Sequence, residues 1–163
     1  MTADNPALRI DVADLLTHRA SRRGVHLEAP LDSLAGSAAR VPDEEPVVLD
    51  LVLERVSDGV VVRGTVRAVW RGTCGVCLTD LEHTLTPGVG ELFEPEPVEG
   101  DTYPLVGHEI DLEQLVRDAV LLELPLAPTC ETTGRGPCTP DVVVEAEPPP
   151  DPRWSALSQL DLS

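Results

Sequence analysis

The chain has 163 residues, which favours one domain, and it carries 29 acidic residues against 12 arginines and no lysine, for a net charge of −17. Most of the excess acid lies in residues 72–163, where three arginines accompany eighteen acids, so this half is unsuited to binding nucleic-acid phosphates. Because the sequence has neither a signal-peptide pattern nor an apolar run of membrane-spanning length, we expect a cytoplasmic protein with no membrane partner.

The first predicted element is a helix that begins after Asp11, a good N-cap residue, and ends between residues 21 and 24. Arg19, Arg22 and Arg23 fall in its expected last turn and form the only compact basic cluster of the sequence. Cations there complement the helix dipole, and we favour this interpretation over a contact with RNA. A short strand is expected over residues 25–31, and a loop over residues 35–46.

Residues 47–71 give the clearest pattern, two alternating apolar runs on either side of Asp58-Gly59, which is typical of a two-residue hairpin turn. This turn predicts that the numbers of paired residues sum to 117. Acids and arginines then lie opposite each other on one face, in the pairs Glu54–Arg63 and Asp50–Arg67.

The same strand places Arg63, Arg67 and Arg71 on one face, a stripe that resembles a nucleic-acid contact when it is considered alone. The predicted register gives carboxylates to the first two and leaves only Arg71 without an opposing acid. We therefore favour a paired, solvated stripe over an RNA-binding one.

Four cysteines form two pairs, which are Cys74 with Cys77 in a C-x-x-C motif and Cys130 with Cys138 across seven residues. Two thiol pairs separated by a long insert are typical of a structural zinc site, in which four sulfur ligands leave no open position for water. A redox pair fits poorly, because this C-x-x-C does not begin a helix. A disulfide and four unconnected buried thiols remain alternatives.

An acidic loop over residues 94–109 follows, and it is either a solvated segment or a docking surface for a basic partner. A second helix is expected over residues 112–123, capped by Asp111 and ended by Pro125, so that it leads the chain directly to Cys130. Residues 139–150 read as an acidic, proline-rich linker, and residues 151–163 as a short helix with Trp154 on its apolar face. The residues that we expect to bind a partner are Glu94, Glu96, Glu99, Asp101 and Trp154.

Taken together, these patterns predict an α+β domain over residues 1–138, with an antiparallel β-sheet built on the long hairpin, two or three helices and a zinc site formed by four cysteines. No catalytic set of side chains is recognisable, so we expect a protein that is not an enzyme.

Several short motifs, taken in their order along residues 45–160, resemble the YceD family, the large ribosomal RNA accumulation proteins of bacteria and chloroplasts. The motifs are Gly64-Thr65-Val66, Cys74-x-x-Cys77-Leu78, Glu91-Leu92-Phe93, Ile110-Asp111-Leu112, Leu124-Pro125-Leu126 and Asp151-Pro152-Arg153-Trp154. The resemblance implies a role in large-subunit rRNA accumulation, zinc held by the four cysteines, and an association with the small basic ribosomal protein bL32.

From the resemblance and the charge together, we expect a non-enzymatic factor in large ribosomal subunit biogenesis that binds a basic ribosomal protein and meets rRNA only indirectly. One alternative is a direct RNA-binding protein that uses Arg19, Arg22, Arg23 and Arg71. Another is an acidic zinc-binding adaptor unrelated to ribosomes.

Overall fold

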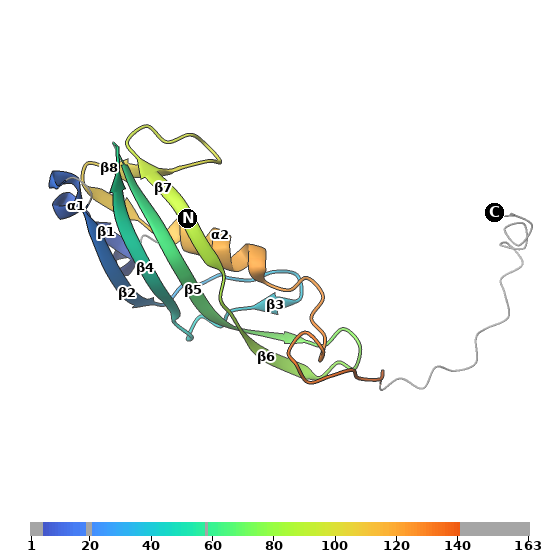
Figure 1. The fold of residues 1–163 in the computed structure, drawn as a ribbon. Helices are drawn as coiled ribbons and strands as arrows, with labels where there is room; N and C mark the ends of the chain where they lie inside the picture. The colour runs from blue at the N-terminus through green and yellow to red at the C-terminus, as the bar shows by residue number, and fades with distance from the viewer. Residues whose placement is uncertain (1–4, 19–20, 58, 141–163) are drawn as a thin grey trace, which may run out of the picture.

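The computed structural model describes residues 5–18, 21–57 and 59–140 (Figure 1). The strands of this part are β1 Arg9–Asp11, β2 Arg22–Ala29, β3 Ala39–Arg40, β4 Val47–Val56, β5 Gly59–Thr73, β6 Asp80–Leu85, β7 Gly88–Glu94, β8 Tyr103–Val106 and β9 Glu109–Asp111. The helices are a short 3-10 helix η1 Pro6–Leu8, α1 Ala13–Thr17 and α2 Glu113–Glu123.

All nine strands belong to one curled sheet, in the order β1-β9-β8-β7-β5-β4-β2, while β3 and β6 pair with β5 outside this path. Strands β7 and β8 are parallel, because residues 95–102 loop round and return the chain beside the end of β7. The expected antiparallel sheet is therefore wrong, since the sheet is mixed. The expected α+β class is also wrong, because the described part is mostly strand and its two α-helices have only 5 and 11 residues.

Strand β5 is the centre of the molecule and has 15 residues, enough to pair along its first half with β4 and β7 and along its second half with β3 and β6. Its even-numbered residues from Val60 to Trp70 point mainly into the core, and so do the odd-numbered residues of β4. Helix α2 packs across this inner face and buries Leu115, Val116 and Val120 there (Figure 1). The alternation in the sequence therefore predicted the buried face of the hairpin correctly.

The register of the hairpin differs from the predicted one by two residues. Val56 pairs with Gly59 and Leu51 with Gly64, so the paired numbers sum to 115. Gly59 is part of β5, where a Cβ atom would overlap the main-chain oxygen of Phe93 on β7. Glycine is needed there for the close approach of two strands, so the chain turns before it, and Ser57 takes a positive φ of 29°.

The shift changes which side chains lie opposite the arginines of β5. Arg63 pairs with Val52 and not with Glu54, and Arg67 pairs with Val48 and not with Asp50. The predicted pairs of acid and arginine across the hairpin are therefore wrong.

The first predicted helix is much shorter than expected. It ends at Thr17, whose hydroxyl donates to Asp14 O at 2.9 Å, and Ser21 Oγ donates to Leu15 O at 2.7 Å. Hydroxyl groups thus occupy main-chain acceptors at the helix end, and β2 begins at Arg22. Arg22 and Arg23 lie on this strand and not in a last helical turn, while Arg19 is outside the described residues.

The second predicted helix is confirmed as α2, and Asp111 Oδ1 accepts the first free N–H, that of Glu113, at 2.9 Å. Glu113 is itself buried and pairs with Arg117, whose Nη2 lies 2.9 Å from Glu113 Oε1. Arg117 also donates to Asp32 O at 2.8 Å, and Asn5 N donates to Glu113 Oε2 at 3.3 Å. One buried ion pair therefore holds the N-terminal segment against the helix.

The predicted strand over residues 25–31 overlaps β2, which ends at Ala29. The expected loops over residues 35–46 and 94–109 contain the short strands β3 and β8. Most of the predicted linker and the whole of the predicted C-terminal helix, Trp154 included, lie outside the described residues. No helix in the described part of the chain is long and apolar enough to cross a membrane.

Candidate metal centre and acidic pocket

The four cysteines gather at one end of the molecule, although more than fifty residues separate the two pairs. Cys74 and Cys77 follow the end of β5, and Cys130 and Cys138 follow α2. Their Sγ atoms all lie within 4.8 Å of one another. The shortest separations are 3.6 Å between Cys74 and Cys138 and 3.4 Å between Cys77 and Cys130.

Main-chain hydrogen bonds shape the first pair into a tight knuckle. Leu78 N donates to Cys74 O at 3.0 Å, and Cys74 N donates to Thr79 O at 2.8 Å. Val76 N points at the sulfur itself and donates to Cys74 Sγ at 3.4 Å. The knuckle is joined to the segment after α2 by Gly75 N, which donates to Pro128 O at 2.9 Å.

The second pair is formed by a loop that folds back on itself. Gly134 and Gly136 have φ values of 74° and 82°, which glycine adopts without the strain that a Cβ brings. Arg135 N donates to Cys130 O at 2.9 Å, and its side chain reaches Asp80 O on β6 at 3.3 Å. The seven-residue gap therefore still lets both thiols meet the first pair.

These separations fit a metal ion with four sulfur ligands. A tetrahedral ion with metal–sulfur bonds of about 2.3 Å places its sulfurs about 3.8 Å apart. A disulfide would need about 2.05 Å, and all four cysteines are free. The described residues offer this set of four thiols as a candidate metal centre.

The thiols do not all ionise with equal ease. Hydrogen bonding, mainly from the N–H of Cys77, lowers the pKa of Cys74 to about 6, and the hydrogen bond with Thr79 lowers the pKa of Cys77. The hydrogen bond with Cys77 raises the pKa of Cys130 to about 12, and burial raises the pKa of Cys138. Four thiolates at this distance repel one another, so a bound cation is what would allow all four to be ionised together.

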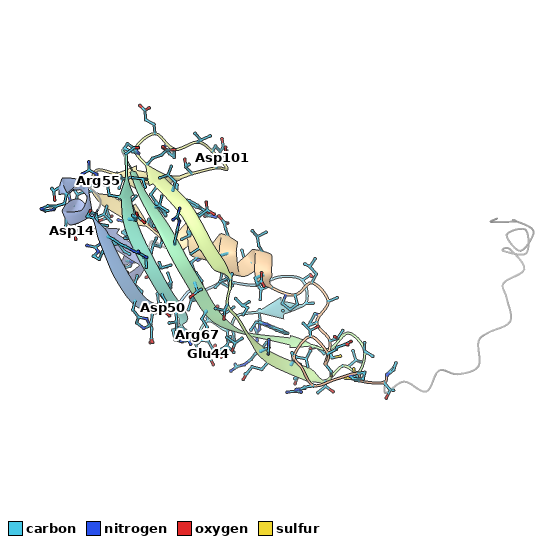
Figure 2. All side chains as sticks on the ribbon, viewed as in Figure 1. Asp14, Glu44, Asp50, Arg55, Arg67 and Asp101 are labelled. Carbon is cyan, nitrogen blue, oxygen red and sulfur yellow. The ribbon has the colours of Figure 1, made fainter. Side chains whose placement is uncertain are left out.

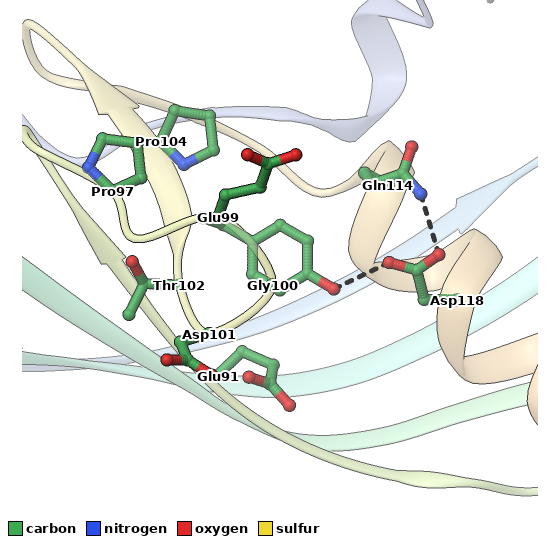
Figure 3. A pocket seen from close by; sticks show the side chains of 10 residues that line it. Glu91, Pro97, Glu99, Gly100, Asp101, Thr102, Pro104, Gln114 and Asp118 are labelled. Carbon is green, nitrogen blue, oxygen red and sulfur yellow. Dashed lines mark hydrogen bonds between the residues drawn. The ribbon is translucent and has the colours of Figure 1, made fainter.

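A second feature is an acidic pocket of about 500 Å³ between α2 and the loop that joins β7 to β8 (Figure 3). The four carboxylates that line it belong to Glu91, Glu99, Asp101 and Asp118. Its other lining residues are Pro97, Gly100, Thr102, Tyr103, Pro104 and Gln114. The pocket therefore combines negative charge with the apolar surface of an aromatic ring and two prolines.

Asp118 is the best-anchored of these acids. Tyr103 Oη donates to Asp118 Oδ2 at 2.9 Å, and Gln114 Nε2 donates to Asp118 Oδ1 at 2.8 Å (Figure 3). Burial, with this carboxylate as a further cause, raises the pKa of Tyr103 to about 12, so the phenol stays protonated and keeps donating. The pocket wall at α2 is therefore fixed by hydrogen bonds.

The expected partner-binding acids are only partly brought together. Glu99 and Asp101 line the pocket, whereas Glu96 does not. Glu94 accepts a hydrogen bond from Thr102 Oγ1 at 2.8 Å, which fixes the base of the loop. Sequence reasoning missed Glu91 and Asp118. The signal for Asp118 was its place one helical turn after Gln114, on the polar side of α2.

The arginines expected for RNA binding do not form a cluster in the described residues. Arg23 is paired with Asp14 at 2.8 Å on the N-terminal side of the sheet. Arg71, expected to lack an acid, contacts three of them, Glu82 at 2.8 Å, Glu45 at 3.1 Å and Glu44 at 3.2 Å. This arginine is therefore neutralised by its surroundings.

Comparison with known proteins gives one family and several relatives. Residues 62–161, more than half of the chain, match the model of the family described as large ribosomal RNA subunit accumulation protein YceD. Uncharacterized proteins of Mycobacterium bovis and Mycobacterium tuberculosis are 38% identical over 125 residues, which are 69% of this chain and 60% of each relative. One of Mycobacterium leprae is 37% identical over 131 residues, 71% of this chain and 59% of the relative. The chain thus spans less than two thirds of these relatives, and no solved structure matches it.

Proposed function

The chain belongs to the YceD family, described as large ribosomal RNA subunit accumulation proteins, and from this membership we propose that it is a non-enzymatic factor in large ribosomal subunit biogenesis. It acts by binding a basic large-subunit ribosomal protein, of which bL32 is the candidate that the family resemblance suggests. The observation that carries this proposal is the acidic pocket beside α2.

The pocket suits the side chain of an arginine or lysine from such a partner. Four carboxylates line a cavity of about 500 Å³, which can accept a cation that has an aliphatic stem. Tyr103 and the two prolines offer the stem apolar surface, and Asp118 is already oriented by two hydrogen bonds. Ribosomal proteins are rich in such side chains, because they neutralise rRNA.

The wider charge of the chain favours the same partner. Residues 72–163 carry a net charge of −15, which attracts a basic protein to this half of the chain. Glu96 and the other acids of the loop steer the encounter, and Trp154, outside the described residues, supplies an apolar anchor. A newly made ribosomal protein would thus be held on an acidic surface until it reaches its site.

The metal that we assign to the four cysteines is zinc, in a structural role. Zinc takes four thiolates in a closed tetrahedron, which joins the end of β5 to the segment after α2 and leaves no position for a reacting water. Four free thiols also agree with a reducing compartment, so we place the protein in the cytoplasm.

The test is a titration of the purified chain with a basic large-subunit ribosomal protein over a series of salt concentrations. The triple variant E91Q/E99Q/D101N should bind more weakly and lose part of the salt dependence, since steering charges are screened within about 8–10 Å near physiological ionic strength.

The control is E123Q/E131Q, which removes exposed acids at the far end of α2 and in the cysteine loop. It should bind nearly as well as the unchanged chain. Equal losses in the two variants would mean that net charge and not the pocket decides binding, and the assignment of the pocket would be wrong.

A further inference from the structure

The outer face of the sheet is turned away from α2 (Figure 1) and carries Arg67 (Figure 2) and Arg63, neither of which has a carboxylate directly opposite on β4. Arg63 lies between Val52 on β4 and Gly90 on β7, and Arg67 lies opposite Val48. Both side chains are exposed. The register predicted from the sequence had placed Glu54 and Asp50 opposite them, and the shift of two residues removes both acids.

Neither arginine forms an ion pair with any residue in the described part of the chain. By register, Glu54 opposite Val61 and Asp50 opposite Thr65 both lie one row from Arg63, and Asp50 lies one row from Arg67 as well. Asp50 Oδ1 lies 2.6 Å from His26 Nδ1 on β2, and this hydrogen bond raises the pKa of His26. Asp50 is thus bound on the side away from β5.

The surface beside the arginines is bare main chain. Gly88 and Gly90 on β7 pair with Thr65 and Arg63 and present no side chain to the outside. A Cβ on Gly90 would meet no atom within 4 Å, and one on Gly88 would meet only the Gly64 oxygen at 3.9 Å. An extended ligand can therefore lie along β7 without a steric obstacle.

Charge is divided across this face. The acids Glu28, Asp50 and Glu54 lie on β2 and β4, on one side of the arginines. On the other side, the outward residues of β5 from Val61 to Arg67, and the outward residues of β7 that pair with them, include no acid. The acidic pocket lies on the other side of the sheet, beside α2 (Figure 3).

The spacing of the two cations selects the kind of ligand. Four residues of extended strand separate their Cα atoms by about 13 Å, which is too far for one small anion to contact both. The exposed hydroxyl of Thr65 lies between them. A chain with repeated negative charge can contact all three groups, and a phosphate accepts two hydrogen bonds from one guanidinium.

We propose that the β5–β7 half of the outer face binds the backbone of single-stranded RNA through Arg63, Thr65 and Arg67. This contact is separate from the acidic pocket, so the protein can hold a basic protein on one side of the sheet and RNA on the other. It differs from the RNA contact expected from the sequence, which relied on Arg71 and the N-terminal arginines.

The test is fluorescence anisotropy of fluorescein-labelled oligouridylate with the full chain, over a series of salt concentrations. R63Q/R67Q should bind roughly tenfold more weakly at low salt and lower the slope of log affinity against log salt by about 1.4, for two lost phosphate contacts. R63K/R67K should keep most of the salt slope, because it keeps both charges.

The matched control is R71Q, which removes an arginine from the same strand and face where three carboxylates already neutralise it. It should change affinity for oligouridylate less than twofold. The proposal fails if the chain does not bind oligouridylate at low salt, or if R63Q/R67Q loses no more than R71Q. It also fails if polyglutamate binds as tightly as oligouridylate, since the ligand would then be an acidic protein.

The outcome is independent of the proposed function. R63Q/R67Q should still bind the basic ribosomal protein, and the pocket variant E91Q/E99Q/D101N should still bind oligouridylate. Loss of both activities in R63Q/R67Q would show a general defect and overturn the assignment of RNA to this face.

Discussion

Replacing Gly64 by alanine should destabilise the protein by about 3–5 kcal/mol, because two costs act at one residue. Gly64 has a φ of 151°, a backbone conformation that side chains with a Cβ rarely adopt. A Cβ there would overlap the oxygen of Asp50 and lie 2.9 Å from Leu51 Cα and 3.0 Å from Asp50 C. These atoms belong to the main chain of β4. The overlap therefore cannot be relieved by the movement of a flexible side chain, and the paired strands themselves would have to shift.

The assay is urea unfolding of the purified unchanged chain and of Gly64→Ala, with the free energy of unfolding taken from the midpoint and the slope of each transition. Gly90→Ala is the matched control, since its added methyl points into open space on the neighbouring strand, and it should change stability by less than about 0.5 kcal/mol. The described hairpin register places Gly64 directly against Leu51. If Gly64→Ala is as stable as Gly90→Ala, this register is wrong.

Three further predictions follow from side chains elsewhere in the fold. Glu113→Ala should cost roughly 3 kcal/mol in urea unfolding, because it leaves the largely buried Arg117 with only Asp32; a loss below 1 kcal/mol would mean that the pair is not buried in solution. The hydrogen bond with Asp50 raises the pKa of His26 above 6.5, so its stabilisation is fully present below about pH 6.5 and is lost as pH rises through the raised value. Asp50→Asn should remove most of this pH dependence of stability, since Glu28 remains as a smaller cause, and an unchanged profile would contradict the pairing. Elemental analysis should find one zinc per chain and less in Cys138→Ser, whereas four freely titratable thiols without zinc in the unchanged protein would refute the metal assignment.

The sequence predicted what depends on local pattern. Alternation of valine and leucine identified the hairpin and its buried face, because side chains of a strand alternate strictly between the two sides. Asp111 and the proline after the helix located α2 to within one residue: the N-cap is Leu112, and Asp111 Oδ1 accepts from Glu113 N. The spacing of the thiols indicated which four would meet, and they lie within 4.8 Å of one another.

What failed depends on contacts between distant segments. Gly59 was interpreted as a turn residue, but it is needed where β7 crosses close to β5, and β7 begins nearly thirty residues later. The parallel pairing of β7 with β8 has no signal in either strand alone. Arg71 was expected to lack an opposing acid. Two of the acids that it contacts, Glu44 and Glu45, were missed because they come from a loop more than twenty residues away in the sequence.

The acidic pocket illustrates the same limit at the candidate site. Glu99 and Asp101 were found because they stand in an acidic run, whereas Glu91 lies on a strand and Asp118 on a helix. Only the packing of α2 against β7, together with the hydrogen bond from Tyr103 of β8 to Asp118, makes them neighbours.

The most direct test of the proposed function is a complementation measurement in cells that lack this protein, with the ratio of large-subunit to small-subunit rRNA as the readout. The unchanged chain and the control E123Q/E131Q should both restore the ratio, and E91Q/E99Q/D101N should restore it only in part, at equal protein levels. Full restoration by the pocket variant would contradict the claim that the acidic pocket supports large-subunit rRNA accumulation.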